Sequence, residues 1–541
     1  MFPERRQTSR KRFHSGLRHG VVFLLALCMG TVAWALSSPD LRSHDDGIYL
    51  ATAQSLIERG EYRLINLPSE PLQTKYPPLY STLLAMALVL VHKPVPLALH
   101  ALKGVNALAL FLIILLIHIT CVRLRAHFSA MGGLMAVVLI ASAPALVSFV
   151  DFFASDLWFT ALFVGLLAAS SATRRPLGSA LGVGVLVGLL TLSRSIGIAL
   201  AGGLVWHLWK SKGVGVAAVA GGGFSAIAGP WLLRSALITP PSLLERYYVQ
   251  YERSAWTLLT SDPSLAVRIL LTNSRLYVAS FSYVLGWSTL WLTAGASLLA
   301  AFGAWRLRHT EWLGLAIRTS LIYLLVLVGH PYPMERYLIP LVPIVIICVV
   351  AGWEWLRRDA GWSPRFMAGS LLVVAIFTSH LMWLRNYGQV ARHGVHGGFG
   401  RPLAIRLSGM KEVTSWILRS TEKTNILAAA NDTMYFIQTG RRAIRPWPQE
   451  AEVYVPGYGR YLSSTTTGQA VQTDLDRLCA TVLVDEPLLV GGESEYARRL
   501  LGSLVESRLS PWLPAFRTSD GLTMIYRRRS TSPCVAKSPG P

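Results

Sequence analysis

Long apolar segments separated by short polar ones run along most of the chain, from 21–36 to 366–384. A helix that crosses a bilayer needs about 20 mostly apolar residues, and rarely fewer than 17. Most of these segments approach that length, so we expect them to be membrane-spanning helices. Between the first and the last, apolar segments lie at 77–91, 97–121, 131–150, 157–173, 178–193, 195–209, 214–233, 283–305, 313–329 and 336–356.

The composition agrees with this pattern. Charged residues make up only 15 % of the 541 residues and hydrophobic residues 52 %, whereas soluble domains carry roughly a quarter charged residues. The chain therefore has too little polar surface for a large soluble enzyme, a disordered protein or a secreted disulfide scaffold. The sequence predicts a polytopic α-helical membrane protein.

Basic residues exceed acidic ones, 51 against 29, which gives a formal net charge of +22. They occur as short pairs between apolar segments and form no continuous basic face, so no nucleic acid is expected as a partner. Such pairs are typical of cytoplasmic loops under the positive-inside rule. The pairs are Arg123/Arg125, Arg174/Arg175, Lys210/Lys212, Arg306/Arg308 and Arg357/Arg358.

The segment at 77–91 decides the predicted topology. It is short and opens with Pro77-Pro78. If it crossed the membrane, two of the basic pairs would face outward. If it lies in the outer interface as an amphipathic or re-entrant helix, every pair faces the cytoplasm, and the positive-inside rule then favours about eleven crossings. A cleaved signal peptide is an alternative for the first segment, because Ala33-Trp34-Ala35 resembles a cleavage site; the many later segments favour an uncleaved span.

This topology divides the chain into a basic cytoplasmic N-terminus at 1–20, a transmembrane domain at 21–384 and an extracytoplasmic domain at 385–541. Two further polar stretches, 37–96 and 234–282, face outward. In the C-terminal part, helical patterns at 411–420 and 495–504 alternate with strand patterns at 425–430, 480–485 and 522–527. We therefore expect a small α/β domain there, in which Cys479 and Cys534 can pair if the compartment is oxidising.

Two adjacent acids, Asp45 and Asp46, follow the first span directly. Adjacent carboxylates repel each other and resist desolvation. They either cap the short helix predicted at 51–59 or take part in chemistry, and their spacing leaves both interpretations open. His44 and His330 lie near this part of the pattern; a lone His is more often a hydrogen-bonded bystander than a ligand.

Several other motifs lie on the predicted outer side in a fixed order. Together with the acid pair they resemble the membrane glycosyltransferases of the GT-C fold, in particular the protein O-mannosyltransferase and aminoarabinose lipid A transferase families and their bacterial relatives. The resemblance covers most of the chain. The motifs are Asp45-Asp46 followed by Tyr49, Lys75-Tyr76-Pro77-Pro78, Asp156 preceded by Asp151, Pro230-Trp231-Leu232-Leu233-Arg234, Glu335-Arg336-Tyr337-Leu338-Ile339-Pro340, and the run from Tyr435 to Arg442.

Two departures limit what the resemblance implies. Ile48 stands where the aminoarabinose transferases have an Arg. Thr74 precedes Lys75 where a Glu is frequent, and Tyr76 is inserted before Pro77. Aminoarabinose and lipid A are therefore not carried over as substrates.

The resemblance implies a hexosyl- or pentosyltransferase that takes its sugar from a polyprenyl-phosphate-linked donor. The acceptor is a hydroxyl or phosphate of a glycolipid, polysaccharide or protein, on the outer face of the inner (plasma) membrane. Transfer then inverts the anomeric carbon in a single displacement. Asp45 matches the first acid of the motif and is the predicted general base. Asp46 is expected to orient the acceptor or tune the neighbouring charge.

Binding of the donor phosphate requires cations on the outer side. Lys75, Arg234 and Arg336 fill that role in the resembling motifs, and Tyr337 and Asp156 are the other predicted donor-binding residues. The alternative for each cation is an anchor at the lipid headgroups. Arg194, at a short outward turn between two spans, is a further candidate because ionisable residues at membrane depth are often functional.

No metal-binding motif of His or Cys is present in the sequence. Asp45, Asp46 and Asp156 can share a divalent cation, since carboxylate oxygens suit Mg²⁺ or Mn²⁺. No nucleotide-binding fingerprint occurs between a strand and a helix.

Three other functional classes stay open. A secondary transporter would place acids or broken helices near the bilayer midplane in two matching halves. A lipid-linked saccharide ligase or polymerase would share the donor but differ in its loops. A non-catalytic scaffold would use the outer domain to bind a partner. The sequence leaves the sugar, the acceptor, the metal and the oligomeric state undetermined.

Overall fold

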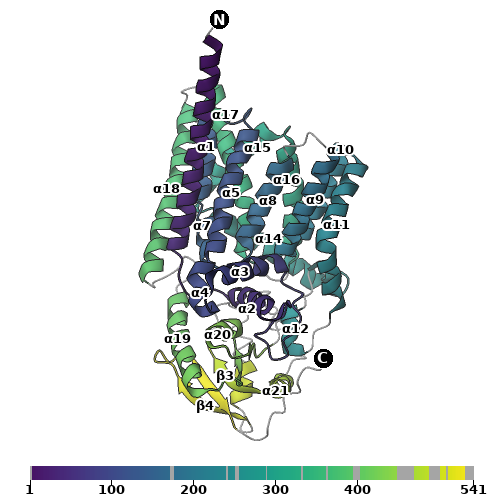
Figure 1. Cartoon of the computed structure of the whole chain (residues 1–541), viewed down its shortest axis with the longest axis vertical. Helices are drawn as coiled ribbons and strands as arrows, with labels where there is room; N and C mark the ends of the chain where they lie inside the picture. The colour runs from purple at the N-terminus through teal and green to yellow at the C-terminus, as the bar shows by residue number, and fades with distance from the viewer. Residues whose placement is uncertain are drawn as a thin grey trace.

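The structure is a computed structural model, and it consists of a helical bundle with a small mixed domain at one end (Figure 1). It describes residues 3–170, 176–238, 242–249, 255–287, 289–330, 333–360, 364–393, 402–447, 468–486, 500–506 and 510–529. The basic pair Arg174/Arg175, Cys534 and the first half of the helix predicted at 495–504 lie outside these ranges, and its second half, 500–504, is helical.

The helices of the bundle, apart from the one at 263–284, follow the apolar segments of the sequence. In chain order they are α1 (Pro3–Ala35), α5 (Gly104–Arg123), α6 (Ala130–Ala141), α7 (Pro144–Ser148), α8 (Asp156–Ser170), α9 (Pro176–Ser193), α10 (Gly197–Lys212), α11 (Val214–Leu237), α14 (Pro263–Val284), α15 (Leu290–Leu307), α16 (Glu311–Val328), α17 (Val342–Ala360) and α18 (Pro364–His393). Two short 3₁₀ helices, η1 (Phe149–Asp151) and η2 (Glu335–Leu341), lie at helix ends.

Within the described residues, six helices are long and apolar enough to cross a membrane, or seven if the bent pair at 130–151 counts as one span. They make the protein an integral membrane protein. The expectation of eleven crossings also counted α1, α8, α9 and α10, which run alongside the six in Figure 1. That count stays a prediction.

The segment at 77–91 forms α3 (Pro78–Val91), which lies across the end of the bundle in Figure 1, as an interfacial helix would. Four further helices have 16 residues or fewer, and the one at 95–102 joins α5 in a single candidate span at 95–123. They are α2 (His44–Arg59), α4 (Val95–Leu102), α12 (Leu243–Val249) and α13 (Ala255–Leu258).

The stretch at 234–282, expected as a polar loop, contains the 22-residue helix α14. The span expected at 283–305 is also wrong at its start, since α14 ends at Val284 and α15 begins at Leu290. Gly286, at φ +73°, breaks the helix between them, because the left-handed region suits glycine. Pro263 lies in the first turn of α14, where proline is well tolerated.

The two ends of the bundle are named here by what lies at each. At one end, which we call the basic end, Arg358 donates to the carbonyl of Ala126 at 2.9 Å and Lys212 lies 3.3 Å from Glu311. At the opposite end, the domain end, buried acids lie beside the C-terminal domain. Which of these ends faces the cytoplasm stays a prediction from the positive-inside rule.

The C-terminal domain holds a five-stranded sheet in the order β2-β1-β3-β5-β4. β1 runs parallel to β2 and β3, and β5 runs antiparallel to β3 and β4. The strands predicted at 425–430, 480–485 and 522–527 and the helix at 411–420 are confirmed. The elements are α19 (Pro402–Ser420), β1 (Ile426–Ala429), α20 (Asp432–Thr439), β2 (Ala443–Ile444), α21 (Gly468–Arg477), β3 (Ala480–Asp485), β4 (Trp512–Arg517) and β5 (Met524–Arg528).

The predicted sidedness can be measured with truncated chains fused to a reporter. A fusion after Arg358 should report the cytoplasm, and a fusion after Arg385 should report the exterior, because α18 carries the chain back across the membrane. The readouts are green fluorescence inside and alkaline phosphatase activity outside. A cytoplasmic signal from the second fusion would contradict the outer placement of the C-terminal domain.

Candidate active site

The acid pair lies at the start of α2, and its two members have different surroundings. Asp46 closes a capping box with Ser43, the N-cap residue. Its carboxylate accepts the N–H of Arg42 at 2.6 Å, the hydroxyl of Ser43 at 2.6 Å and the N–H of Phe153 at 3.2 Å. The side chain is buried, and this burial raises the pKa of Asp46. Asp46 therefore fixes the helix start and joins it to the bundle.

Asp45 points instead toward a cluster of charged and aromatic side chains. Its Oδ2 forms an ion pair with Arg336, and its Oδ1 accepts the hydroxyl of Tyr76 at 2.8 Å. Burial by itself would raise the pKa of Asp45, but the opposing effects of Arg336 and His44 outweigh it and hold the pKa well below its usual range. In this state Asp45 is a carboxylate with 14 % of its side chain exposed.

A second ion pair joins Arg194, at the end of α9, to Asp156, at the start of α8. The guanidinium of Arg194 lies 5.1 Å from the ring centre of Tyr337, and that of Arg336 lies 5.6 Å from it. These distances are in the range of cation–π contacts. Oδ2 of Asp156 is buried and has no hydrogen-bond partner among the described residues. Two guanidiniums thus flank one aromatic ring, each neutralised by its own acid.

A buried ionic network holds the chain that leads into α2. Lys103 is fully buried, and its ammonium donates to the carbonyl of Ser38 at 2.6 Å and to Asp151 at 2.6 Å. Arg42 donates to the other oxygen of Asp151 at 2.7 Å. A buried cation without an acid would cost several kcal/mol, so Asp151 and Lys103 together fix the stretch between α1 and α2.

The other two predicted cations, Lys75 and Arg234, lie on or against the 62–77 loop. The Gln73 side chain accepts the N–H groups of residues 74 and 75, both at 2.8 Å, and the Lys75 carbonyl accepts the Ser195 hydroxyl at 3.3 Å. Arg234 donates to the carbonyls of Gln73 at 2.5 Å and Tyr62 at 3.4 Å. The contacts described for Arg234 therefore hold the loop and do not include Asp45.

The structure thus brings together Asp45, Arg336, Tyr337 and Asp156 of the predicted site residues, with Arg194, the further candidate, beside them. The remaining predicted residues have other described contacts: Asp46 caps α2, Arg234 holds the loop, and the backbone of Lys75 is fixed within it.

The C-terminal domain contacts the residue next to Asp45. Asp432, the first residue of α20, is fully buried and accepts a hydrogen bond from Tyr248 at 2.7 Å. Its other oxygen lies 2.8 Å from Nε2 of His44. The Thr433 hydroxyl donates to the His44 carbonyl at 2.7 Å. Sequence reasoning missed Asp432, because no local pattern connects it to a residue nearly four hundred positions earlier.

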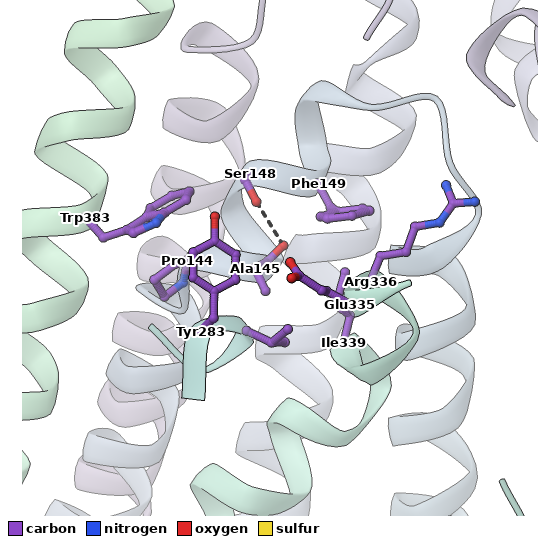
Figure 2. A pocket seen from close by; sticks show the side chains of 10 residues that line it. Pro144, Ala145, Ser148, Phe149, Tyr283, Glu335, Arg336, Ile339 and Trp383 are labelled. Carbon is purple, nitrogen blue, oxygen red and sulfur yellow. Dashed lines mark hydrogen bonds between the residues drawn. The ribbon is translucent and has the colours of Figure 1, made fainter. Parts of the chain in front are cut away.

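A small pocket lies beside η2, between α7, α14 and α18 (Figure 2). Glu335 points into it, and Ser280 donates a 3.3 Å hydrogen bond to its carboxylate. Arg336 extends away from the pocket in Figure 2, toward its ion pair with Asp45. Glu335 and Arg336, consecutive in the motif, therefore point in different directions from η2.

Among the residues that the structure describes, no group of three or more His, Cys, Asp or Glu side chains is placed to hold a metal ion. Asp45 and Asp156 each pair with a different guanidinium, and Asp46 is occupied by the helix cap. The predicted sharing of a cation by these three acids does not fit this arrangement, and we derive no step through a metal.

The sequence matches no protein-family profile and no curated protein. The fold is similar to solved structures of two GT-C proteins. ArnT from Cupriavidus metallidurans in the apo state has a TM-score of 0.58 at 13 % identity, over 93 % of this chain and 97 % of that one. The Archaeoglobus fulgidus oligosaccharyltransferase in complex with Zn and sulfate has a TM-score of 0.55 at 13 % identity, over 93 % and 73 %. ArnT bound to undecaprenyl phosphate has a TM-score of 0.53 at 13 % identity, over 94 % and 97 %. The chain has the GT-C fold, as the motifs predicted.

The close approach of α2 to α20 gives a test of how the C-terminal domain docks. A Cβ at Gly47 would lie 2.6 Å from the carbonyl carbon of Thr433. We expect Gly47→Ala to destabilise the junction by about 1–3 kcal/mol, as overpacking does, and to speed proteolysis of the C-terminal domain. Gly182→Ala is the control, since a Cβ there meets nothing within 4 Å. Equal proteolysis and melting of the two variants would contradict the contact.

Proposed function

We propose that this protein is a membrane glycosyltransferase which moves a sugar from a polyprenyl-phosphate-linked donor to a hydroxyl or phosphate acceptor. We propose that transfer takes place at the outer face of the inner membrane. In this proposal 37–96 is the catalytic loop of the transmembrane domain at 21–384. The observation that carries it is the Asp45 carboxylate, held against Arg336 where the bundle meets the C-terminal domain. In support, one solved protein of this fold is bound to undecaprenyl phosphate and another to a dolichol-phosphate.

Asp45 is the proposed general base. As the acceptor oxygen attacks the anomeric carbon, its proton passes to the carboxylate of Asp45. The bond between that carbon and the phosphate oxygen breaks, and the phosphate leaves with the electron pair. One displacement of this kind inverts the anomeric carbon. Because the polyprenyl phosphate is already a good leaving group, a second carboxylate as general acid is not required.

The ion pair explains how the base is kept inactive and then activated. With Arg336 against it, Asp45 has a lowered pKa and is a weak base, since base strength follows pKa. A donor phosphate offers Arg336 a second anion, and a guanidinium binds phosphate with a bidentate geometry. When Arg336 turns toward the phosphate, the charge that lowers the pKa of Asp45 is reduced. Donor binding thereby produces a stronger base.

The remaining predicted donor-binding residues have supporting roles around Arg336 and the donor phosphate. Arg194 and Arg336 both lie against the Tyr337 ring, so Arg194 is a second guanidinium that can stabilise charge developing on the phosphate. Asp156 holds Arg194 in place. We assign Lys75 as a further phosphate ligand, because its loop carries Tyr76, which contacts Asp45. Arg234 then acts through that loop as a positioning residue.

Asp46 is also a positioning residue in this proposal. Its capping box sets the direction of the first turn of α2, and that turn carries Asp45. Its hydrogen bond from the Phe153 N–H connects this turn to the segment that precedes Asp156.

The positions of the acids that the structure describes argue against a secondary transporter. Asp151, Asp156 and Glu335 gather at the domain end, and buried Glu354 lies at the basic end, where it pairs with Arg357. A transporter site would lie between these ends, near the midplane. A lipid-linked saccharide ligase or polymerase shares the proposed donor chemistry, and the acceptor separates it from a single-sugar transferase.

The test is transfer of a labelled sugar in membranes that contain a polyprenyl-phosphate donor. We expect Asp45→Asn to lower the rate by about 10²–10⁴, the usual contribution of a general base, while the amount of protein in the membrane stays unchanged. Glu61→Gln is the matched control, because Glu61 lies in the same loop with its side chain 52 % exposed and bonded only to Arg63 in the described contacts. Full activity of Asp45→Asn would contradict the assignment of the base.

A further inference from the structure

A second cavity, larger than the pocket beside η2, lies away from Asp45. It is a cleft of about 1230 Å³ between α3, the start of α4 and the C-terminal domain. Its lining includes Arg59, in the last turn of α2, whereas Asp45 lies in the first turn. At 1.5 Å per residue these two positions are about 20 Å apart along the helix. The cleft is therefore separate from the cluster around Arg336.

The cleft carries an excess of positive charge. Glu70 forms ion pairs with both Arg59 and Arg442, so one carboxylate with 10 % exposure is shared by two guanidiniums. Lys93 and Lys423 are exposed and also line the cleft, and Glu58 is the other acid in the lining. Two acids thus face four Lys and Arg side chains. Such an excess favours an anionic ligand, because guanidinium and ammonium groups bind phosphate strongly.

One wall of the cleft continues into an apolar surface. Leu88 and Val89 of α3 line the cleft, and the exposed side of α3 and α4 carries Leu90 at 80 % and Leu97 at 74 % exposure. In a protein that spans the membrane, exposed side chains of this size at the end of the bundle are suited to the lipid acyl chains. Lys423 and Arg442 line the cleft from the C-terminal domain, and Lys93 lines it from the turn that follows α3.

We propose that this cleft binds the phosphate headgroup of an anionic membrane phospholipid, whose acyl chains lie along the exposed side of α3 and α4. The cations around Glu70, together with Lys93 and Lys423, receive the phosphate. The occupant is a lipid and not a free anion, because the charged pocket and the apolar surface are continuous. The binding site does not depend on the reaction at Asp45.

The test uses the purified full chain in detergent and a phosphatidylglycerol that carries a fluorescent label on one acyl chain. Binding is followed by fluorescence anisotropy, and the competitors are unlabelled phosphatidylglycerol, phosphatidylcholine and inorganic phosphate. We expect competition by phosphatidylglycerol at least tenfold more effective than by phosphatidylcholine. Inorganic phosphate should not compete at lipid-equivalent concentrations.

The variant that tests the location is Lys93→Glu with Lys423→Glu. Each cation near a lipid surface contributes about 1 kcal/mol, so removing two should weaken binding by about thirtyfold or more. The matched control is Arg419→Glu with Arg517→Glu, which makes the same change of charge at exposed positions outside the cleft. It should bind as the unmodified protein does.

Three results would overturn the proposal: equal competition by phosphatidylcholine, competition by inorganic phosphate as strong as by the lipid, or equal loss of binding in the two double variants. Asp45→Asn should bind the probe normally. Loss of sugar transfer with retained lipid binding, or the reverse, therefore separates a failure of the proposed function from a failure of this site.

Discussion

Three acids at the domain end each have a cation beside them, and these ion pairs organise the junction between the bundle and the C-terminal domain. Asp45 pairs with Arg336, Asp156 with Arg194, and Asp151 with Lys103. In each pair the two residues come from segments far apart in the chain. Losing one partner would leave the other charged and desolvated, which costs about 3–5 kcal/mol. The pairs therefore fix the loop after α1, the start of α8, the end of α9 and η2 relative to one another.

This arrangement places a reactive acid without exposing it fully. The Asp46 carboxylate uses its hydrogen bonds to cap the helix. Asp45, one residue earlier, has one carboxylate oxygen that is paired with a single guanidinium, and that guanidinium can move away from it. Asp432 of the C-terminal domain contacts His44 on the other side of Asp45. The first turn of α2 is therefore held from two directions, by the bundle through Arg336 and by the C-terminal domain through Asp432.

The sequence predicted the helical membrane fold and most of the C-terminal strands, because these follow from the lengths and patterns of the apolar segments. The order of the motifs along the chain predicted that Asp45, Asp156, Arg336 and Tyr337 lie together. The sequence left the role of Asp46 open, since two adjacent acids at the start of a helix are equally consistent with a helix cap and with a catalytic pair. The helix α14 was missed because its alternation of polar and apolar residues lacks the uniform hydropathy of a span. Asp432, and Lys103 within an apolar segment, acquire their roles only from partners that are remote in sequence.

The central claim is that Arg336 exchanges Asp45 for the donor phosphate. A cryo-electron microscopy structure of the full chain with undecaprenyl phosphate tests this most directly. The account predicts that the guanidinium of Arg336 contacts the phosphate, that its ion pair with Asp45 is broken or lengthened, and that Tyr76 still donates to Asp45. A bound phosphate away from Arg336, with the Asp45–Arg336 pair intact, would contradict it.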